Sequence, residues 1–226
     1  MPKPPNKLII DYGGTWIRFY LESSFLFSRV PTIPLPQLPA LIEKTLSQWK
    51  VSSLHELIVG AKGVWKIKDK NGLHRQLHHL AEKVTVLSDV ELTHRSIFGN
   101  KAGIVLISGT GSIAYGKDRK GKFARAGGLG PQKGDEGSGY WIGKEYLKRT
   151  GKDWENKSVR EVAALAKTVL KKYEKKDPLC TAIVQEAQKH LKRLILSVDK
   201  KLNLKKFPLH LHGGLFKNKS FRKLEM

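Results

Sequence analysis

Residues 103–116 read GIVLISGTGSIAYG, which is an apolar run, a turn of glycines and hydroxyl side chains, and a second apolar run. The run GIVLIS has the continuous apolar character of a buried strand, and IAYGK after the turn reads as its partner strand. In the turn, backbone N–H groups next to glycine can approach an anion closely, and the hydroxyl adds a donor. The segment therefore predicts a hairpin whose turn, formed by Gly109, Thr110 and Gly111, binds phosphate.

A similar pattern lies near the N-terminus, where residues 8–22 read LIIDYGGTWIRFYLE. It predicts a strand, a tight turn supplied by Gly13 and Gly14, and a returning strand. Asp11, at the end of the first strand, is suited to hold a hydrated Mg²⁺, and Thr15 adds a hydroxyl to the turn. Taken alone, an ordinary hairpin with Asp11 capping its turn explains the motif equally well. Two such turns in one chain favour phosphates held from two sides.

The richest glycine segment comprises GGLG at residues 127–130 and GDEGSGYW at residues 134–141. So many glycines lose much conformational entropy in regular structure, and they are typical of backbone that approaches a ligand. Asp135 and Glu136 lie where a helix over residues 137–148 is predicted to begin. Capping the start of this helix, where the helix dipole favours a carboxylate, is the preferred role for Glu136. For Asp135, a contact with substrate hydroxyls is at least as well supported.

Two other positions have two interpretations each. Asp89 follows the apolar strand TVLS and precedes a predicted helix, so it is either a general base for a hydroxyl or the helix N-cap. The residues alone favour the cap. Gly213 and Gly214 follow a predicted strand near the C-terminus, where they either admit an adenine or ribose against the backbone or form a plain turn.

The rest of the chain predicts a mixed α/β protein, with hairpins first and helices later. The four prolines of residues 31–39 predict an extended loop. Further strands are predicted at residues 24–30, 56–60, 85–88 and 208–212, and further helices at residues 38–49, 74–83, 158–174 and 177–201. The helix at 158 opens with a capping box, and Asp177 before Pro178 marks the start of the last helix.

Composition restricts the class of protein. The 226 residues, 40% of them hydrophobic, suffice for a core, and the sequence lacks the apolar run of about 18 residues that a membrane helix needs. The single cysteine, Cys180, excludes a disulfide framework within the chain and indicates a reducing cytoplasm. The formal net charge of +22 favours anionic partners, although a solvated face that keeps the protein soluble is the simpler explanation. The absence of a nucleic-acid-binding motif speaks against a DNA or RNA partner.

Taken together, the motifs are similar to those of the BadF/BadG/BcrA/BcrD-type ATPases, a family that includes N-acetylglucosamine kinase and belongs to the sugar kinase, actin and heat-shock chaperone superfamily. The matching stretches occur in the family's order within residues 10–214: IDYGGT, LSD, GIVLISGTGSIAYG, GGLG, GDEGSGYWIG and HGG. The resemblance implies an actin-like ATPase fold of two ribonuclease H-like lobes, residues 1–99 and 100–226, with ATP and Mg²⁺ in the cleft between them.

The resemblance also implies roles for individual residues. Asp11 corresponds to the metal-associated aspartate and Asp89 to the general base, which reverses the preference for a cap. The first phosphate loop corresponds to Gly13, Gly14 and Thr15, the second to Gly109, Thr110 and Gly111, the sugar contacts to Gly128, Gly130 and Asp135, and the adenosine motif to Gly213 and Gly214.

The chain departs from the family pattern in two places. The proline-rich segment replaces the stretch where N-acetylglucosamine kinases place an Asn-x-Trp-type sugar contact, and the chain ends at Met226, soon after HGG, which implies shortened C-terminal elements. The lone Cys180 also speaks against the cluster-bridging role of some relatives.

The sequence thus predicts a cytoplasmic, ATP-dependent kinase that phosphorylates a hydroxyl of an amino sugar or related sugar. Its expected partners are ATP, Mg²⁺ and the sugar, without a membrane, and homodimerisation stays open. The alternative is a non-catalytic nucleotide-binding or regulatory protein of the same fold.

Overall fold

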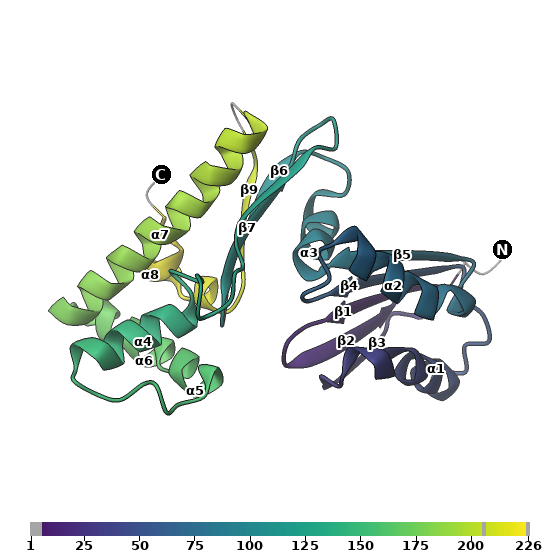
Figure 1. Cartoon of the computed structure of the whole chain (residues 1–226), viewed down its shortest axis with the longest axis horizontal. Coiled ribbons are helices and arrows are strands. Elements are labelled where there is room, and N and C mark those ends of the chain that lie inside the picture. The colour runs from purple at the N-terminus through teal and green to yellow at the C-terminus, as the bar shows by residue number, and fades with distance from the viewer. Residues whose placement is uncertain (1–5, 205–206, 225–226) are drawn as a thin grey trace. The chain divides into compact units, whose positions relative to one another are not determined.

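The structure is a computed structural model that describes residues 6–204 and 207–224. The chain divides into two compact units, Met1–Ser96 and Ile97–Met226. The division falls within helix α3 (Asp89–Phe98), so this helix joins the two units. Figure 1 labels most of the helices and strands of the two units.

Unit 1, Met1–Ser96, is built on a five-stranded sheet. Its strands are β1 (Lys7–Tyr12), β2 (Trp16–Leu21), β3 (Leu26–Pro31), β4 (Glu56–Ala61) and β5 (Lys83–Ser88), in the order β3-β2-β1-β4-β5. β1, β2 and β3 pair antiparallel, whereas β1, β4 and β5 run parallel. This arrangement brings the carboxyl ends of β1, β4 and β5 to one edge of the sheet.

Besides α3, unit 1 contains the helices α1 (Leu38–Gln48) and α2 (Ile67–Leu77) and the short 3₁₀ turns η1 (Glu22–Ser24), η2 (Leu35–Gln37) and η3 (His78–Leu80). Alternate residues of the central strands, such as Ile10 and Val59, form one apolar cluster with side chains of α1 and α2. α3 packs closely on β4, since a Cβ placed on Gly60 would lie 2.5 Å from the Cβ of Leu92.

Unit 2, Ile97–Met226, contains a four-stranded sheet in the order β8-β7-β6-β9. The strands are β6 (Gly103–Ser108), β7 (Ser112–Lys117), β8 (Phe123–Gly127) and β9 (Leu209–His212). β6 and β7 form an antiparallel hairpin, and β9 runs parallel to β6, with Ile107 opposite His212. The carboxyl ends of β6 and β9 therefore lie next to each other.

The long helix α7 (Pro178–Leu202) extends along this sheet (Figure 1). Its buried side chains, among them Ile195 and Val198, belong to the same core as Ile104 and Leu106 of β6. The other helices of unit 2 are α4 (Gly139–Arg149), α5 (Val159–Ala164), α6 (Ala166–Glu174), α8 (Lys219–Arg222) and the 3₁₀ turn η4 (Leu215–Lys217).

Most of the expected elements are present, with three differences. The helix predicted at residues 74–83 begins instead at Ile67 and ends at Leu77, because its N-cap, Lys66, makes no capping side-chain bond that the sequence could signal. The helix predicted from Ser158 to residue 174 has its capping box but is interrupted at Leu165 into α5 and α6. Strand β8 (Phe123–Gly127) was not predicted, since its apolar pattern is short and ends in glycine.

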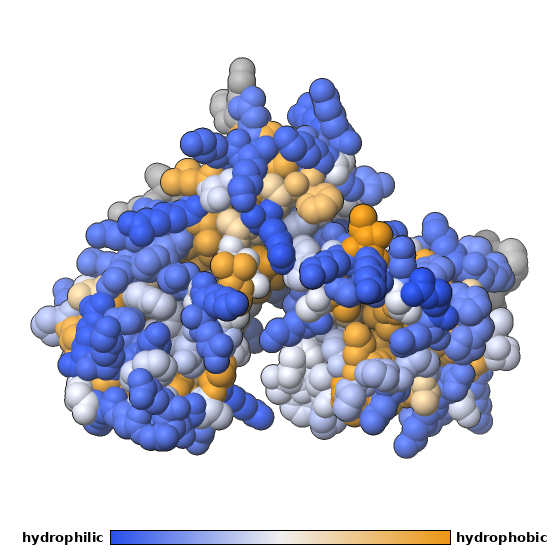
Figure 2. All heavy atoms as spheres, in the orientation of Figure 1, coloured by the Kyte–Doolittle hydropathy of each residue, from blue (hydrophilic) through white to orange (hydrophobic). Residues whose placement is uncertain are grey.

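The surface seen in Figure 2 is largely hydrophilic, which agrees with 42 Lys and Arg residues in the chain. Within the described ranges 6–204 and 207–224, none of the helices combines the length and apolarity needed to cross a bilayer.

Candidate functional site

Charged side chains gather at the edge of the unit 1 sheet where the parallel strands end. Asp11 lies near the end of β1, Lys62 follows β4 directly, and Asp89 follows β5 directly. The register places Asp11 opposite Gly60, which in turn lies opposite Leu87, so the three strand ends are level to within a few residues. Carboxyl ends of parallel strands are where open α/β sheets bind ligands.

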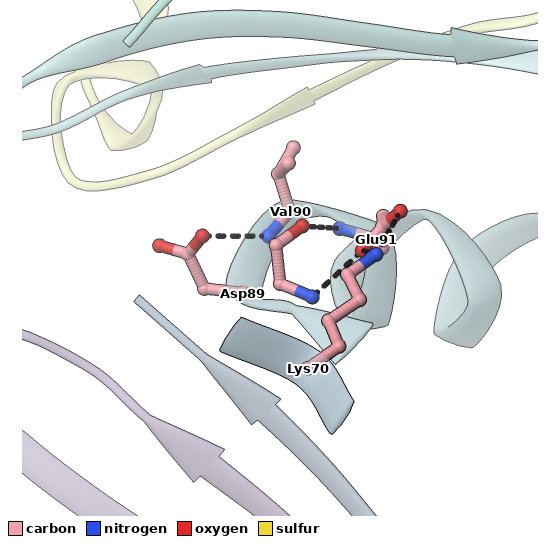
Figure 3. Close-up of polar contacts among 5 residues, drawn as sticks. Lys70, Asp89, Val90 and Glu91 are labelled. Carbon is pink, nitrogen blue, oxygen red and sulfur yellow. Dashed lines mark hydrogen bonds and ion pairs between the residues drawn. The ribbon is translucent and has the colours of Figure 1, made fainter. Parts of the chain in front are cut away.

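Asp89 is the first residue of α3 but is not its N-cap (Figure 3). Ser88 and Glu91 form a capping box instead, because the Ser88 N–H donates to Glu91 Oε2 over 2.7 Å and the Glu91 N–H donates to Ser88 Oγ over 3.3 Å. Asp89 Oδ1 accepts the adjoining Val90 N–H, at 3.0 Å. The structure thus removes the interpretation of Asp89 as the helix N-cap, because Ser88 and Glu91 perform the capping. Its role as a base stays a prediction.

The start of α3 is braced by an ion pair with α2. Lys70 Nζ donates to both carboxylate oxygens of Glu91, at 2.8 and 2.6 Å (Figure 3). The side chains of Lys70 and Glu91 are 21% and 10% exposed, so water screens the pair only weakly. This pair fixes Glu91, which caps the helix, and so holds the backbone that carries Asp89.

We expect Lys70→Met to lower the free energy of unfolding by about 1–3 kcal/mol, because it removes two charge-assisted hydrogen bonds from a carboxylate that is mostly out of water. Urea unfolding of the purified chain measures the change. Glu82→Gln is the matched control, because Glu82 is 73% exposed in its pair with His55 and a surface pair contributes little. Equal stabilities of the two variants would show that the Lys70–Glu91 pair does not brace α3.

The surroundings of Asp89 disfavour its charged form. Burial raises the pKa of the Asp89 carboxyl, the hydrogen bond from Val90 lowers it, the nearby Asp11 carboxylate raises it, and the Lys62 ammonium lowers it, with a net rise. A carboxylate with a raised pKa is a stronger base than an ordinary aspartate, which suits proton abstraction from a hydroxyl.

A pH dependence follows if Asp89 is the base. The base must be deprotonated, so kcat/KM falls as pH drops through the Asp89 pKa, and the raised pKa moves this fall to higher pH than an ordinary aspartate would give. Initial rates measured across the acid range would locate the midpoint. A profile that stays flat down to about pH 4, the ordinary pKa of an aspartate, would contradict the assignment.

Asp11 fits a magnesium site, with one competitor. Its Oδ2 accepts from Arg18 Nη1 at 2.6 Å, and the two side chains remain 39% and 45% exposed. Mg²⁺ takes one or two carboxylates together with waters and phosphate oxygens, so a single accessible aspartate near a turn predicted to bind phosphate is a suitable donor set. Arg18 would have to share or release the carboxylate.

The first glycine turn is held by residues around it. The Gly13 N–H donates to Trp16 O at 3.1 Å, Thr32 Oγ1 donates to Gly13 O at 2.9 Å, and the Thr32 N–H donates to Thr15 O at 3.1 Å. Neither Gly13 nor Gly14 has a positive φ. The two glycines therefore do not serve the turn conformation that the sequence suggested. They allow close approach instead, since a Cβ on Gly14 would lie 2.8 Å from Lys62 Nζ.

In unit 2, the second glycine turn packs on the N-terminus of α4. The Gly139 N–H donates to Gly109 O at 2.7 Å, and the Tyr140 N–H donates to Thr110 O at 3.3 Å. Ser108 Oγ donates to Gly137 O at 2.9 Å, which ties the end of β6 to the same segment. The Gly109 N–H donates to Gly111 O at 2.9 Å, so an anion at this turn would have to be bound by the N–H groups of Thr110 and Gly111.

Asp135 lies beneath this turn. Its side chain is buried, with 6% exposed, and Oδ1 accepts the Ser112 N–H at 3.4 Å. A Cβ on Gly111 would lie 2.8 Å from Asp135 Oδ2, so only glycine leaves room for the carboxylate. The structure thus shows Asp135 supporting the second glycine turn, whereas the sequence predicted a substrate contact, which stays a prediction.

Capping of α4 differs from expectation. Ser138 is the N-cap, and its Oγ accepts the Trp141 N–H at 3.2 Å. Glu136 is exposed and lies outside the helix, so the capping role preferred for it was wrong.

The C-terminal glycines lie beside the second turn. Gly213 has φ +105°, and a Cβ there would overlap the carbonyl oxygen of Ser108. Gly213 and Gly214 thus follow β9 and lie beside the end of β6, where the second glycine turn begins. Their predicted contact with adenosine is not tested by this geometry. Gly128 (φ +68°) and Gly130 (φ +86°) follow β8, and the Gly128 N–H donates to Ser112 O at 2.8 Å. Their predicted sugar contacts are not tested by this geometry.

Sequence reasoning missed Lys62, Lys70 and Glu91. A lysine that follows a strand matches no sequence motif. Lys62 becomes a candidate site residue only because β4 lies between β1 and β5 in the sheet. The pair Ser88–Glu91 does match the spacing of a capping box and was available as a signal.

Other metal chemistry finds no support in the described ranges. Across residues 6–204 and 207–224, no three His, Cys, Asp or Glu side chains are grouped to hold a metal ion by themselves. Burial, with the neighbouring Asp177, raises the pKa of the Cys180 thiol to about 11, so this thiol remains protonated and is a poor metal ligand at neutral pH.

Comparison with solved structures identifies the fold. A proposed N-acetylglucosamine kinase from Chromobacterium violaceum superposes with a TM-score of 0.75 at 21% identity, over 99% of this chain and 91% of that one. MreB5 of Spiroplasma citri bound to ADP superposes with a TM-score of 0.52 at 8% identity, over 94% of this chain and 86% of that one. With two mixed sheets and a glycine turn in each unit, the protein has the actin-like ATPase fold.

Sequence relatives then give the family. The model of the BadF/BadG/BcrA/BcrD ATPase family matches residues 27–225, and the chain belongs to this family. The N-acetylmuramic acid/N-acetylglucosamine kinase of Clostridium acetobutylicum is 28% identical over 197 residues, which are 72% of this chain and 64% of the relative. The N-acetyl-D-glucosamine kinase of Dictyostelium discoideum is 31% identical over 156 residues, which are 54% of this chain and 49% of the relative. The aligned part thus spans less than two thirds of either relative.

Proposed function

We propose that the protein transfers the γ-phosphoryl group of ATP to a hydroxyl of an amino sugar. The observation that carries the proposal is the Asp89 carboxylate, which is free of the capping role, has a raised pKa and lies at the strand edge shared with Asp11. The kinases of amino sugars among the relatives support the same substrate class.

The chain's own groups suit each part of this reaction. Asp89 accepts the proton of the attacking hydroxyl, the hydroxyl oxygen forms the new bond to phosphorus, and ADP leaves with the electrons of the broken P–O bond. Backbone N–H groups of the glycine turns bind phosphate oxygens. Asp11 would hold Mg²⁺, which neutralises phosphate charge when it is bound. The full proposed set is Asp89 as base, Asp11 for the metal, Gly13, Gly14, Thr15, Gly109, Thr110, Gly111, Gly213 and Gly214 for the nucleotide, and Gly128, Gly130 and Asp135 for the sugar.

The test is ADP release from ATP and Mg²⁺ with a panel of acceptors. N-acetylglucosamine and N-acetylmuramic acid are expected to stimulate release, and glucose, which lacks the acetamido group, is expected to be poorer. The phosphorylated sugar should appear in the same amount as ADP. Release that no acceptor stimulates would contradict a kinase.

One observation favours a second function. Arg18 holds the proposed metal ligand Asp11 at 2.6 Å, and a carboxylate engaged in this way is less available to Mg²⁺. A nucleotide-binding protein without turnover would retain such a pair. Tight nucleotide binding combined with no sugar-dependent ADP release would support this alternative.

A further inference from the structure

Lys62 occupies a special place at the proposed site. It is the first residue after β4, and its N–H donates to Tyr12 O at 2.9 Å, which fixes its backbone beside the end of β1. From there its side chain reaches over the first glycine turn, since a Cβ placed on Gly14 would lie 2.8 Å from Nζ and 3.3 Å from Cδ. The ammonium group therefore lies against the backbone of the turn predicted to bind phosphate.

The other charged groups at this edge are engaged. Arg18 is paired with Asp11 at 2.6 Å, and Asp89 accepts the Val90 N–H. Lys62, in contrast, is exposed and has no carboxylate at ion-pair distance among the residues that the structure describes. Lys62 acts on the Asp89 carboxylate electrostatically, but from beyond ion-pair distance. A cation held over a glycine turn with no direct ion pair is positioned for an anion from solution.

Phosphate also needs such a cation here. Asp89 places a carboxylate at the strand edge that repels a triphosphate, whereas Asp11 is paired with Arg18 at 2.6 Å and would hold Mg²⁺. Lysine is a compact charge that binds phosphate oxygens well, and negative charge spreads over the γ-phosphoryl oxygens during transfer.

We propose that Lys62 binds the γ-phosphate of ATP over the first glycine turn. This inference rests on the proposed function and adds to it a residue that selects ATP over ADP. ADP lacks the phosphoryl group that Lys62 contacts, so the contact is made with the triphosphate alone.

Calorimetric titration of the full chain with a non-hydrolysable ATP analogue and with ADP, both with Mg²⁺, tests the inference. Lys62→Met is expected to weaken binding of the ATP analogue by about tenfold to a hundredfold, which is the range for a lost hydrogen bond to a charged group. Binding of ADP should weaken by less than about twofold. Lys62→Arg should keep most of the affinity. Lys68→Met is the control, because Lys68 is exposed on α2 and its loss removes the same charge from the same unit.

Gly14→Ala provides an independent variant. The backbone at Gly14 has no positive φ, and the nearest atoms to the added methyl group are those of the Lys62 side chain, so the substitution should displace the ammonium and leave the turn intact. We expect the same selective loss of affinity for the ATP analogue. Combined with Lys62→Met it should cause no further loss, since both changes remove one contact.

The outcomes are distinguishable. Suppose that the wild-type chain binds both nucleotides and that Lys62→Met lowers the affinity for both equally, or for neither. The inference is then wrong and the proposed function stands. If the wild-type chain binds neither nucleotide, the proposed function fails, and this inference fails with it. Thermal unfolding of each variant shows whether it is folded.

Discussion

Asp89→Asn is expected to lower kcat for sugar phosphorylation by about 10²- to 10⁴-fold, the usual contribution of a general base, while the nucleotide still binds. Asparagine has nearly the same shape, and its amide oxygen can still accept the Val90 N–H that Asp89 Oδ1 accepts at 3.0 Å. An amide cannot take up the proton of an attacking hydroxyl at neutral pH. The defect should therefore appear in the chemical step.

Stability separates this effect from misfolding. Because burial disfavours the charged carboxyl of Asp89, the neutral asparagine should leave the free energy of unfolding unchanged or raise it. Single-turnover rates, calorimetric nucleotide affinity and urea unfolding of the same preparation would be compared. Turnover close to that of the wild-type chain would remove Asp89 from the role of base.

Gly213→Ala is expected to lower the free energy of unfolding by about 2–5 kcal/mol, because backbone strain and overpacking act together. The φ of Gly213 is +105°, a conformation that side chains rarely adopt, and the new methyl group would overlap the Ser108 carbonyl. The end of β6 would have to move, and the second glycine turn follows it directly. Weaker nucleotide binding should accompany the lost stability.

Gly214→Ala is the matched control. Gly214 has φ −63° and ψ −32°, and a Cβ there meets nothing within 4 Å, so alanine should change stability little. Urea unfolding gives the magnitudes, and hydrogen exchange shows whether the loss is confined to the β6–β9 sheet. Similar stabilities for the two alanine variants would contradict the close approach of Gly213 to Ser108.

Much of the fold could be predicted because several elements carry local signals. The hairpin of β6 and β7 has apolar strands around a glycine turn, and Asp177 before Pro178 marks the start of α7. α2 could not be placed correctly, because its start at Ile67 lacks a capping side chain and Gly72 interrupts its pattern. β8 depends on pairing with β7, which local sequence does not encode.

The candidate site was predictable only in part, for a related reason. Asp11 lies near the end of a strand, and Asp89 and the glycine turns each follow one, all in recognisable motifs. Lys62 becomes part of the site through sheet order, since β4 lies between β1 and β5. The burial of Asp135 under the second turn likewise depends on contacts between segments distant in sequence. Such features follow from tertiary structure and not from spacing along the chain.

The carbonyl groups of both glycine turns are tied to neighbouring segments, Gly13 and Thr15 to Thr32, and Gly109 and Thr110 to the start of α4. Glycine-rich backbone normally samples many conformations and loses that freedom when a ligand orders it. Here most of this freedom is already lost on folding. A ligand bound by these turns would then bind more tightly, because little of the interaction free energy would be lost in ordering a chain that is already preorganised.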